Sequence, residues 1–336
     1  MKRKTNSIGL NVSIKDVVQM EEGNNLTLDV VVPLYNDEEV IEQLCTAVLS
    51  SLGNEFKSLR LILIDDGSKD DSHKAALEMK DLHAEIEVIK LAGNFGQHRA
   101  ILAGLRATNA DLVAVMDSDL QDRPEHIPTL VKRMLEDGTS MAIARRVRRV
   151  DSLRKRVSSR LFATTSNLLV PFKVDPHLGA FRVMKQSIVK QICDVKENTG
   201  TPFSMLYSLR VPYSAVDLER DGRAAGSSGY TLKKSVKLAS DRIMTYSTKP
   251  IRLAIVLGII FGLFSIAIAG YSIVNYILQD RVAPGWTSIV FVTSFFGGLN
   301  LLFLGILGEY IGRIYIESRG IPNYIVQEST IDDDSS

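Results

Sequence analysis

Cysteine is scarce in this chain, with Cys45 and Cys193 the only two among 336 residues. Two cysteines cannot build a disulfide framework, and neither stands in a spacing typical of metal ligands. The scarcity therefore predicts a reducing compartment and two buried thiols. Cys45 falls on the core-facing side of a predicted helix, where we expect an unreactive thiol.

Signals of several other protein classes are also absent. No GxGxxG follows the first predicted strand and no GxxxxGK[ST] occurs, which disfavours dinucleotide oxidoreductases and P-loop NTPases. The start, MKRKTNSIGLNVSIKD, has no apolar stretch after its basic residues, so we do not expect a signal peptide. Lys+Arg (40) nearly balances Asp+Glu (39), so the net charge indicates no particular partner.

Long uncharged segments, by contrast, are concentrated toward the C-terminus. Residues Leu253–Leu278 and Val282–Gly308 contain no charged side chain. About 20 apolar residues span a bilayer, so each segment is a candidate transmembrane helix. Buried core helices are the alternative, but two such segments separated by a short polar turn favour a membrane hairpin with spans at about 253–278 and 285–308.

Basic residues lie outside this hairpin on both sides. They are Lys233, Lys234, Lys237, Arg242, Lys249 and Arg252 before the first span, and Arg313 and Arg319 after the second. The connecting loop has Arg281 as its only basic residue. The positive-inside rule then predicts a multi-pass protein of the inner (plasma) membrane, with both termini and the preceding domain in the cytoplasm.

Upstream of the hairpin, short apolar runs alternate with amphipathic stretches. The runs predict strands at Leu28–Leu34, Leu59–Ile64, Glu85–Leu91 and Asp111–Met116. The stretches between them predict helices at 37–49, after Ser68 to about 82, and at 96–108, the first of them capped by Asn36 or Asp37. Continuous apolar strands alternating with helices are typical of an α/β domain with a mostly parallel sheet covered on both faces.

Polar clusters follow three of these predicted strands. They are Tyr35-Asn36-Asp37, Asp65-Asp66-Gly67-Ser68 and Asp117-Ser118-Asp119. Carboxylates at the tip of a buried strand must be solvated, paired or bound to a cation. Because ligands of parallel sheets bind beyond the carboxyl ends of the strands, the three clusters predict one shared site.

The segment Arg145–Arg160 carries eight Lys/Arg in sixteen positions. A solvated basic face is one interpretation, and nucleic-acid binding is another, although no aromatic residues are interleaved for base stacking. In a membrane-anchored protein we favour a basic amphipathic segment at the anionic leaflet, which could also grip a lipid phosphate. Residues 230–249 form a second such segment, so two interfacial amphipathic helices are expected.

Five motifs in order resemble one known family. They are VVPLYNDEE, LIDDGSKDDS, NFGQHRAILAGL, DSDLQDRPEHIP and RDGRAAGSSGYTLKK…STKPIR. Together with the paired spans and the later GEYIGRIY, residues from about 28 to 326 resemble the membrane-anchored polyprenyl-phosphate glycosyltransferases of glycosyltransferase family 2. This group includes dolichyl-phosphate mannose synthase, bactoprenol glucosyltransferases and undecaprenyl-phosphate aminoarabinose transferases.

The resemblance implies a GT-A fold, a nucleotide-sugar donor and a divalent cation, Mg²⁺ or Mn²⁺. The residues implied to bind the donor nucleotide are Pro33, Tyr35, Asp37, Asp65, Asp66, Asn94 and Asp117. The family's DxDxQ motif, which holds the metal and the donor diphosphate, is matched by Asp117, Asp119 and Gln121. The implied catalytic residues are Asp117, Asp119 and Asp175, the last matching an aspartate near the reacting phosphate.

The resemblance also implies an acceptor site made of basic residues and a serine. The residues concerned are Arg146, Arg149, Lys155, Ser159, Arg220 and Arg223, with Ser228 and Tyr230 completing the late pattern. The chain departs from relatives at GNFG, GAFR and GSSGY, where they commonly read RNFG, GDFR and GESKY. These departures bear on which sugar or nucleotide is used rather than on the reaction.

The implied reaction moves a sugar from a UDP-sugar to a polyprenyl (undecaprenyl or dolichyl) phosphate, with inversion, for cell-envelope or glycan assembly. A phosphate monoester with a second pKa of about 6 is largely ionised at neutral pH, so no strong base is required. One rival, a processive polysaccharide synthase, typically carries QxxRW, whereas the single tryptophan here, Trp286, lies in the second span. The other rival is a non-catalytic membrane scaffold. Loss of the DSD motif would have favoured this alternative, but the motif is present.

The expected organisation has five parts. An N-terminal extension (1–27) precedes the cytoplasmic GT-A domain (28–229), a juxtamembrane interfacial helix (230–250), the transmembrane hairpin (251–316) and a cytoplasmic tail (317–336). The expected partners are the nucleotide-sugar, the polyprenyl phosphate and the bilayer, with no nucleic acid. Homo-oligomerisation through the membrane helices is compatible with this organisation.

Overall fold

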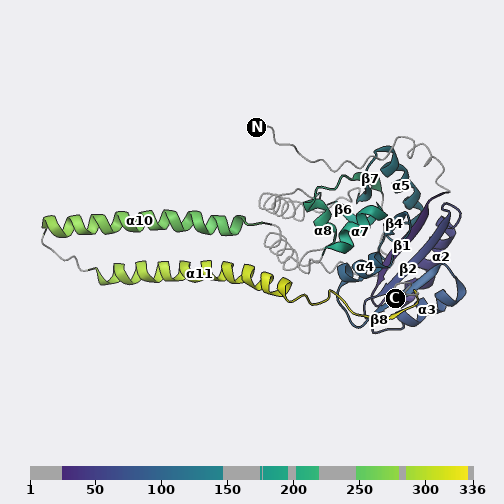
Figure 1. The fold of residues 1–336 in the computed structure, drawn as a ribbon. Coiled ribbons are helices and arrows are strands. Elements are labelled where there is room, and N and C mark those ends of the chain that lie inside the picture. Colours follow the sequence, from purple (N-terminus) through teal and green to yellow (C-terminus); the bar gives the residue numbers. More distant parts are fainter. Residues whose placement is uncertain are drawn as a thin grey trace.

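The computed structural model describes residues 25–146, 175, 177–195, 202–218, 247–279 and 285–331, which form an α/β domain and two long helices extending away from it (Figure 1). The strands are β1 (Thr27–Leu34), β2 (Ser58–Asp65), β3 (Ile86–Leu91), β4 (Leu112–Val115), β5 (Met141–Arg146), β6 (Leu178–Lys185), β7 (Ser214–Leu218) and β8 (Val326–Ser329). The helices are η3 (Glu38–Val40), α2 (Ile41–Leu52), α3 (Ser72–Leu82), α4 (Gln97–Arg106), η4 (Pro124–His126), α5 (Ile127–Glu136), α7 (Gln186–Asp194), α8 (Pro202–Ser208), α10 (Lys249–Gln279) and α11 (Trp286–Ser318).

The described strands form one 8-stranded sheet in the order β7-β5-β6-β4-β1-β2-β3-β8. The central strands β4, β1, β2 and β3 are parallel neighbours, so they all end at the same edge. β6 and β8 run antiparallel to their neighbours, which makes β5 and β7 parallel to the central strands. We call the edge at which these six parallel strands end the carboxyl edge; the mostly parallel α/β fold predicted from the sequence is confirmed.

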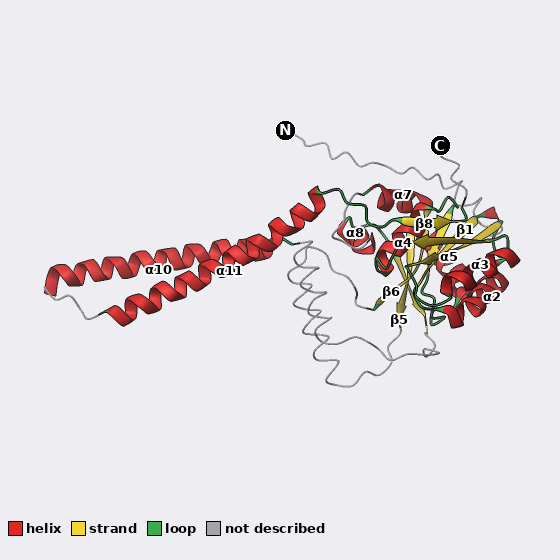
Figure 2. Ribbon diagram, turned by 90° about the horizontal axis from the view of Figure 1, so that it is seen from below, coloured by secondary structure: helices red, strands yellow, loops and turns green. Residues whose placement is uncertain are grey.

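Helices cover both faces of the sheet (Figure 2). One core contains α2, α3 and α5, the other contains α4, α7 and α8, and successive strand residues alternate between the two cores. Val30 and Val32 of β1 belong to the first core and Val31 belongs to the second. Gly104 lets α4 lie close to the sheet, because a Cβ added there would lie 2.5 Å from Val31 Cγ1.

The elements predicted between residues 28 and 116 are present, but the capping prediction is wrong. The chain makes the 3₁₀ turn η3 before α2 begins at Ile41, and Asp37 makes no side-chain capping bond there. Cys45 is buried, and burial raises the pKa of its thiol to about 12, as expected for an unreactive cysteine. Cys193 is only partly buried, and burial raises its pKa to about 11.

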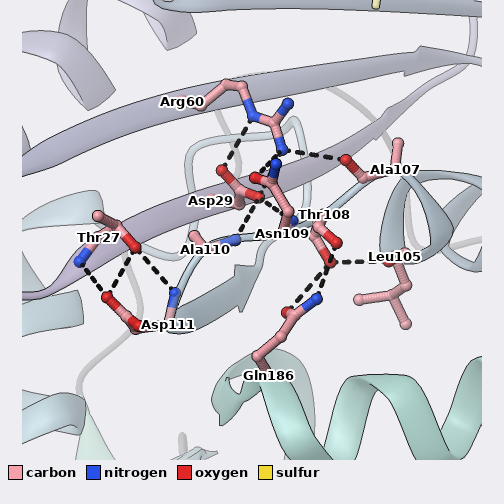
Figure 3. A network of polar contacts seen from close by, with 10 residues as sticks. All are labelled: Thr27, Asp29, Arg60, Leu105, Ala107, Thr108, Asn109, Ala110, Asp111 and Gln186. Carbon is pink, nitrogen blue, oxygen red and sulfur yellow. Dashed lines mark hydrogen bonds and ion pairs between the residues drawn. The ribbon is translucent and has the colours of Figure 1, made fainter. Parts of the chain in front are cut away.

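A polar network joins the strands near the opposite, amino edge of the sheet (Figure 3). Arg60 donates from Nε and Nη2 to the two carboxylate oxygens of Asp29, at 3.0 and 2.7 Å. Asp29 also accepts the backbone N–H groups of Asn109 and Ala110, at 2.9 and 3.2 Å. Because Asp29 is buried, these four donors compensate for the solvation that its carboxylate loses.

The two long helices α10 and α11 lie side by side and away from the domain (Figures 1 and 2). They contain candidate membrane spans of 20 residues (Lys249–Ile268) and 24 residues (Phe295–Ser318), and none of either span is buried. Phe261 packs edge to face against Phe295 and Phe296, with ring centroids 5.7 and 5.9 Å apart. Apolar spans without a buried residue do not match the alternative of buried core helices.

Candidate active site

The loops after β1 and β2 interlock at the carboxyl edge. Asn36 N–H donates to Ser68 Oγ at 3.0 Å, and Lys69 N–H donates to Asn36 Oδ1 at 2.9 Å. Asn36 has a φ of 54°, a left-handed conformation that asparagine adopts more readily than most residues. The polar cluster after β1 is thereby fixed to the cluster after β2, as the shared site predicted from the sequence requires.

Asp37 connects three parts of this edge. Its Oδ2 accepts the Tyr35 N–H at 3.0 Å and the Ser118 hydroxyl at 2.7 Å. Its own N–H donates to Ser72 Oγ, at the start of α3, at 2.8 Å. The Asp37 carboxylate, which was predicted to cap a helix, therefore joins the loop after β1 to the DSD motif after β4.

Asp65 and Asp66 are both buried, and their carboxylates organise neighbouring loops. Asp66 accepts the N–H groups of Phe95 and Gly96 at 2.7 and 2.8 Å, which fixes the loop after β3. Burial raises the pKa of the Asp66 carboxyl, and the two N–H donors partly offset that effect. Asp65 Oδ1 accepts the Ser68 N–H at 2.9 Å. Direct contact of either aspartate with a nucleotide stays a prediction.

Gly67 allows the loops after β2 and β3 to approach each other. Its φ is 68°, and a Cβ added there would lie 2.5 Å from the carbonyl carbon of Gly93 and 2.7 Å from the backbone nitrogen of Asn94. A side chain at this position would be strained and would push the loops apart. The structure therefore brings the predicted nucleotide-binding residue Asn94 beside the DDGS turn.

The DSD motif forms a tight turn beyond β4. Asp117 Oδ1 accepts the side-chain amide of Gln97 at 2.6 Å, and Asp119 Oδ1 accepts the Gln121 N–H at 3.2 Å. Leu120, between Asp119 and Gln121, has a φ of 52°, which is uncommon for a residue other than glycine, asparagine or aspartate. Such strained residues cluster at functional sites, because surrounding contacts must hold them in place.

The chemistry of this turn fits a divalent cation that is only partly ligated by protein. In the described part of the chain, no group of three or more His, Cys, Asp and Glu residues could hold a metal ion by itself. Two carboxylates and an amide side chain nevertheless offer the hard oxygen ligands that Mg²⁺ and Mn²⁺ accept. Mg²⁺ in particular is usually held by one or two carboxylates, with substrate phosphates and water completing its shell.

A buried cation lies on β6, next to the strand that leads into the DSD motif. Arg182 is paired in register with Val115 of β4, and its guanidinium lies 3.5 Å from the centroid of the Phe203 ring. It donates to the backbone carbonyls of Gly179 and Ala180, at 2.7 and 2.9 Å. Burial lowers its pKa, and the charge of Asp117 acts in the opposite direction.

The remaining predicted site residues extend the same edge where the structure describes them. Asp175 lies just before β6, and its Oδ1 accepts the His177 N–H at 2.9 Å. Arg146 is the last residue of β5 and is paired in register with Leu218, the last residue of β7. The other predicted acceptor residues lie outside the described residues: Arg149, Lys155, Ser159, Arg220, Arg223, Ser228 and Tyr230.

Three site residues were missed by the sequence analysis. Ser118 and Gln97 bind predicted site carboxylates, and His73 lies 4.0 Å from Asp65. Ser118 is the middle residue of the DSD motif, and its position in the sequence does not indicate that its hydroxyl binds Asp37. Gln97 lies inside the motif NFGQHRAILAGL and His73 directly follows LIDDGSKDDS, so their positions beside these motifs were the sequence signals that could have drawn attention to them.

Comparison with known proteins places these motifs in a family. Residues 29–193 match the model of Glycosyl transferase family 2. A bactoprenol glucosyl transferase of Shigella phage SfX is 30% identical over 308 residues, which cover 90% of this chain and 99% of that protein. The chain belongs to glycosyltransferase family 2. An undecaprenyl-phosphate 4-deoxy-4-formamido-L-arabinose transferase of Photorhabdus laumondii is 31% identical over 315 residues, covering 90% of this chain and 93% of that protein.

A solved structure matches this glycosyltransferase more distantly. It is glucosyl-3-phosphoglycerate synthase from Mycobacterium tuberculosis in complex with Mn²⁺, UDP and glucosyl-3-phosphoglycerate, with 18% identity and a TM-score of 0.46. The match covers 70% of this chain and 84% of that one. Family membership confirms the prediction of a glycosyltransferase and leaves the non-catalytic scaffold without support.

Proposed function

We propose that this family 2 glycosyltransferase moves a sugar from a UDP-sugar to a polyprenyl phosphate at the cytoplasmic face of the inner (plasma) membrane. The observation that carries the proposal is the combination of two features in one chain. The carboxylate cluster lies at the carboxyl edge, and the candidate spans of the two apolar helices contain no buried residue. Relatives named for bactoprenol and undecaprenyl phosphate support a polyprenyl phosphate as the acceptor.

The path of the chain supports a membrane acceptor. The segment after α11 reaches the domain at the carboxyl edge, where the Ala92 N–H donates to the Ile325 carbonyl at 2.9 Å. β5 and β7, which precede the two basic segments, also end at this edge. A lipid phosphate lies at the bilayer surface while its hydrocarbon lies within, so an acceptor site at this edge is well placed.

The donor nucleotide is proposed to lie across the interlocked loops. Tyr35, Asp37 and Asn94 would contact it beside Pro33 at the end of β1. Asp65 and Asp66 would act with them, and the structure supports at least an indirect role, because their carboxylates hold the Ser68 turn and the Phe95 loop.

The DSD motif is proposed to hold the donor diphosphate. Asp117, Asp119 and Gln121 would ligate a divalent cation, which when bound supplies Lewis-acid neutralisation of the charge on the departing nucleoside diphosphate. Gln97 holds the Asp117 carboxylate in one orientation, which reduces the reorganisation needed on donor binding. Arg182 adds positive potential behind this turn.

The acceptor is proposed to need positioning more than activation. Its phosphate oxygen is already ionised at neutral pH, so the enzyme must hold two anions in line. Arg146, Arg149 and Lys155, with Ser159, Arg220 and Arg223, would bind that phosphate, and Asp175 would lie near the reacting oxygen. Attack on the anomeric carbon from the face opposite the departing diphosphate would invert the configuration.

The proposed organisation assigns a role to each segment. Residues 28–229 form the catalytic domain after an N-terminal extension, 230–250 lie at the membrane interface, 251–316 cross the membrane twice, and 317–336 return to the cytoplasm. Homo-oligomerisation through the two membrane helices belongs to the same proposal.

Incubation of purified membranes with polyprenyl phosphate and a panel of radiolabelled nucleotide-sugars tests this function. Label from a UDP-sugar should move into the lipid fraction as a polyprenyl-phosphate-sugar. Incorporation into a growing polysaccharide would instead favour a processive synthase. No transfer from any member of the panel would refute the proposal.

A further inference from the structure

The last described strand, β8, completes the sheet next to the donor loops. It pairs antiparallel with β3, with Lys90 opposite Glu328. Thr330 anchors its end: its N–H donates to the Val88 carbonyl at 3.0 Å, and its Oγ1 accepts the Val88 N–H at 2.9 Å. Figure 1 shows this strand, in yellow, at the border of the sheet and connected to α11.

One histidine links β8 to the DDGS motif. Glu328 Oε2 lies 3.2 Å from His73 Nε2, and His73 Nδ1 lies 4.0 Å from Asp65 Oδ2. His73 stands in the first turn of α3, one residue after Ser72, whose hydroxyl accepts the Asp37 N–H. The imidazole therefore stands between a carboxylate of β8 and a carboxylate of the predicted donor site.

Two polar atoms in this link are buried without a hydrogen-bond partner. They are Asp65 Oδ2 and His73 Nδ1, and they face each other. A buried polar atom without a partner is destabilising, and a hydrogen bond between these two atoms would satisfy both of them. A ring that carries a proton on each nitrogen can donate to both carboxylates at once. The position of the ring, which Glu328 restrains, thus decides whether Asp65 Oδ2 has a donor.

We propose that β8 is a positioning element of the donor site. Glu328 orients His73, His73 restrains Asp65, and Asp65 Oδ1 holds the Ser68 N–H in the turn against which the nucleotide lies. Glu328 and His73 are positioning residues, because neither is assigned a contact with substrate. The inference rests on the proposed function for the nature of the ligand, a nucleoside diphosphate. It couples the segment that follows the second apolar helix to donor binding.

Two measurements on the full-length protein in detergent test the coupling. Amide hydrogen exchange of the turn at residues 66–72 reports on its restraint and needs no ligand. Titration with UDP and Mg²⁺ reports on the donor site without an acceptor. In Glu328→Ala we expect faster exchange in the turn and UDP binding weaker by roughly threefold to tenfold, because Glu328 is half exposed and solvent screens its contact with His73.

A second variant, His73→Ala, removes both halves of the link and should weaken UDP binding by about tenfold or more. Gln327→Ala is the matched control, since it alters the neighbouring exposed position of β8 and leaves Glu328 in place. A melting temperature for each variant separates loss of the turn's restraint from global unfolding. Glu328→Asp should restore part of the lost affinity.

Each outcome has one consequence. Unchanged exchange of the turn in both His73→Ala and Glu328→Ala overturns the inference. Faster exchange with unchanged UDP affinity also overturns it, because the link would then not position the donor. If the wild-type protein binds no nucleotide, the proposed function fails, while the exchange measurement still decides whether β8 restrains the turn.

Discussion

The Ser118 hydroxyl donates to the Asp37 carboxylate at 2.7 Å, so the middle residue of the DSD motif fixes the loop after a different strand. Asp117 and Asp119 are the proposed cation ligands. Ser118 lies between them, and its hydrogen bond to Asp37 aligns them with the loop after β1. This hydrogen bond thereby connects the turn proposed to bind a cation with the loop proposed to bind the nucleotide. Displacing one is expected to displace the other.

Substitution of this serine should therefore impair use of the donor. In Ser118→Ala we expect kcat/KM for the nucleotide-sugar to fall by roughly tenfold, since hydrogen bonds to charged groups contribute about 1.5–3 kcal/mol. The KM for lipid phosphate should hardly change. Ser50→Ala is a matched control, because the Ser50 hydroxyl donates only to backbone carbonyls within α2. Equal losses in the two variants would contradict the assignment.

Substitution of the two aspartates of the DSD motif, which are proposed cation ligands, should reduce activity to different extents. Asp119→Asn is expected to nearly abolish sugar transfer, and chelation should do the same to the wild-type protein. Asp117→Asn should be milder if this residue mainly contacts the ribose or a metal-bound water. Transfer assays with EDTA, followed by addition of Mg²⁺ or Mn²⁺, check these expectations. Full activity in excess EDTA would refute the metal dependence.

The basic residues at the end of β5 and just after it should affect binding of the acceptor alone. Charge-assisted bonds to phosphate are stronger than exposed surface pairs, so Arg146→Ala and Arg149→Ala should each raise KM for polyprenyl phosphate about tenfold or more. KM for the nucleotide-sugar should stay near its wild-type value. Measurement in detergent removes attraction to an anionic leaflet. A loss confined to donor affinity would show that the acceptor assignment is wrong.

The network near the amino edge should govern stability and leave kinetics unchanged. Breaking a buried ion pair by removing one partner typically costs about 3–5 kcal/mol, so Asp29→Asn should lower the free energy of unfolding by about 3 kcal/mol. The kcat/KM of the folded fraction should not change, because the network lies away from the carboxyl edge. Lys74→Met, which removes an exposed pair with Glu78, provides the control and should be nearly silent.

Cysteine labelling should test the membrane topology. Asp280→Cys, between the two apolar segments, and Gln327→Cys, at an exposed position of β8, should react with an impermeant reagent from opposite sides of the membrane. The natural thiols should stay unlabelled near pH 7.5, since burial raises the pKa of Cys45 to about 12 and that of Cys193 to about 11, which leaves little thiolate. Labelling of both introduced cysteines from one side would exclude the hairpin.

The central part of the fold could be predicted because three of its four strands carry two signals in the sequence, an apolar run and a polar cluster that follows it. The apolar run from Leu28 to Leu34 is followed by the cluster Tyr35-Asn36-Asp37, and the apolar runs before Asp65 and Asp117 are likewise followed by polar clusters. Parallel order then required their ends to meet, which brought the three clusters together without any knowledge of side-chain positions.

Other features depended on tertiary contacts that leave little trace in the sequence. β8 reads Val-Gln-Glu-Ser and is exposed, so it has no apolar face by which a strand could be recognised. Its pairing with β3 joins residues more than two hundred positions apart, beyond any local pattern. The role of Asp37 was predicted wrongly for the same reason: a helix cap is a local rule, whereas the Ser118 hydroxyl that donates to the Asp37 carboxylate comes from another loop.

The place of β8 at the border of the sheet also fixes an order of assembly. Until β8 arrives, β3 presents an unpaired edge, and an open edge strand is a template for pairing with other chains. β8 follows both apolar helices in the sequence, so it can close that edge only after α10 and α11 have been synthesised. A nascent chain of this protein therefore carries an open β3 until both apolar helices have been synthesised, and a chain stalled before β8 leaves that edge exposed.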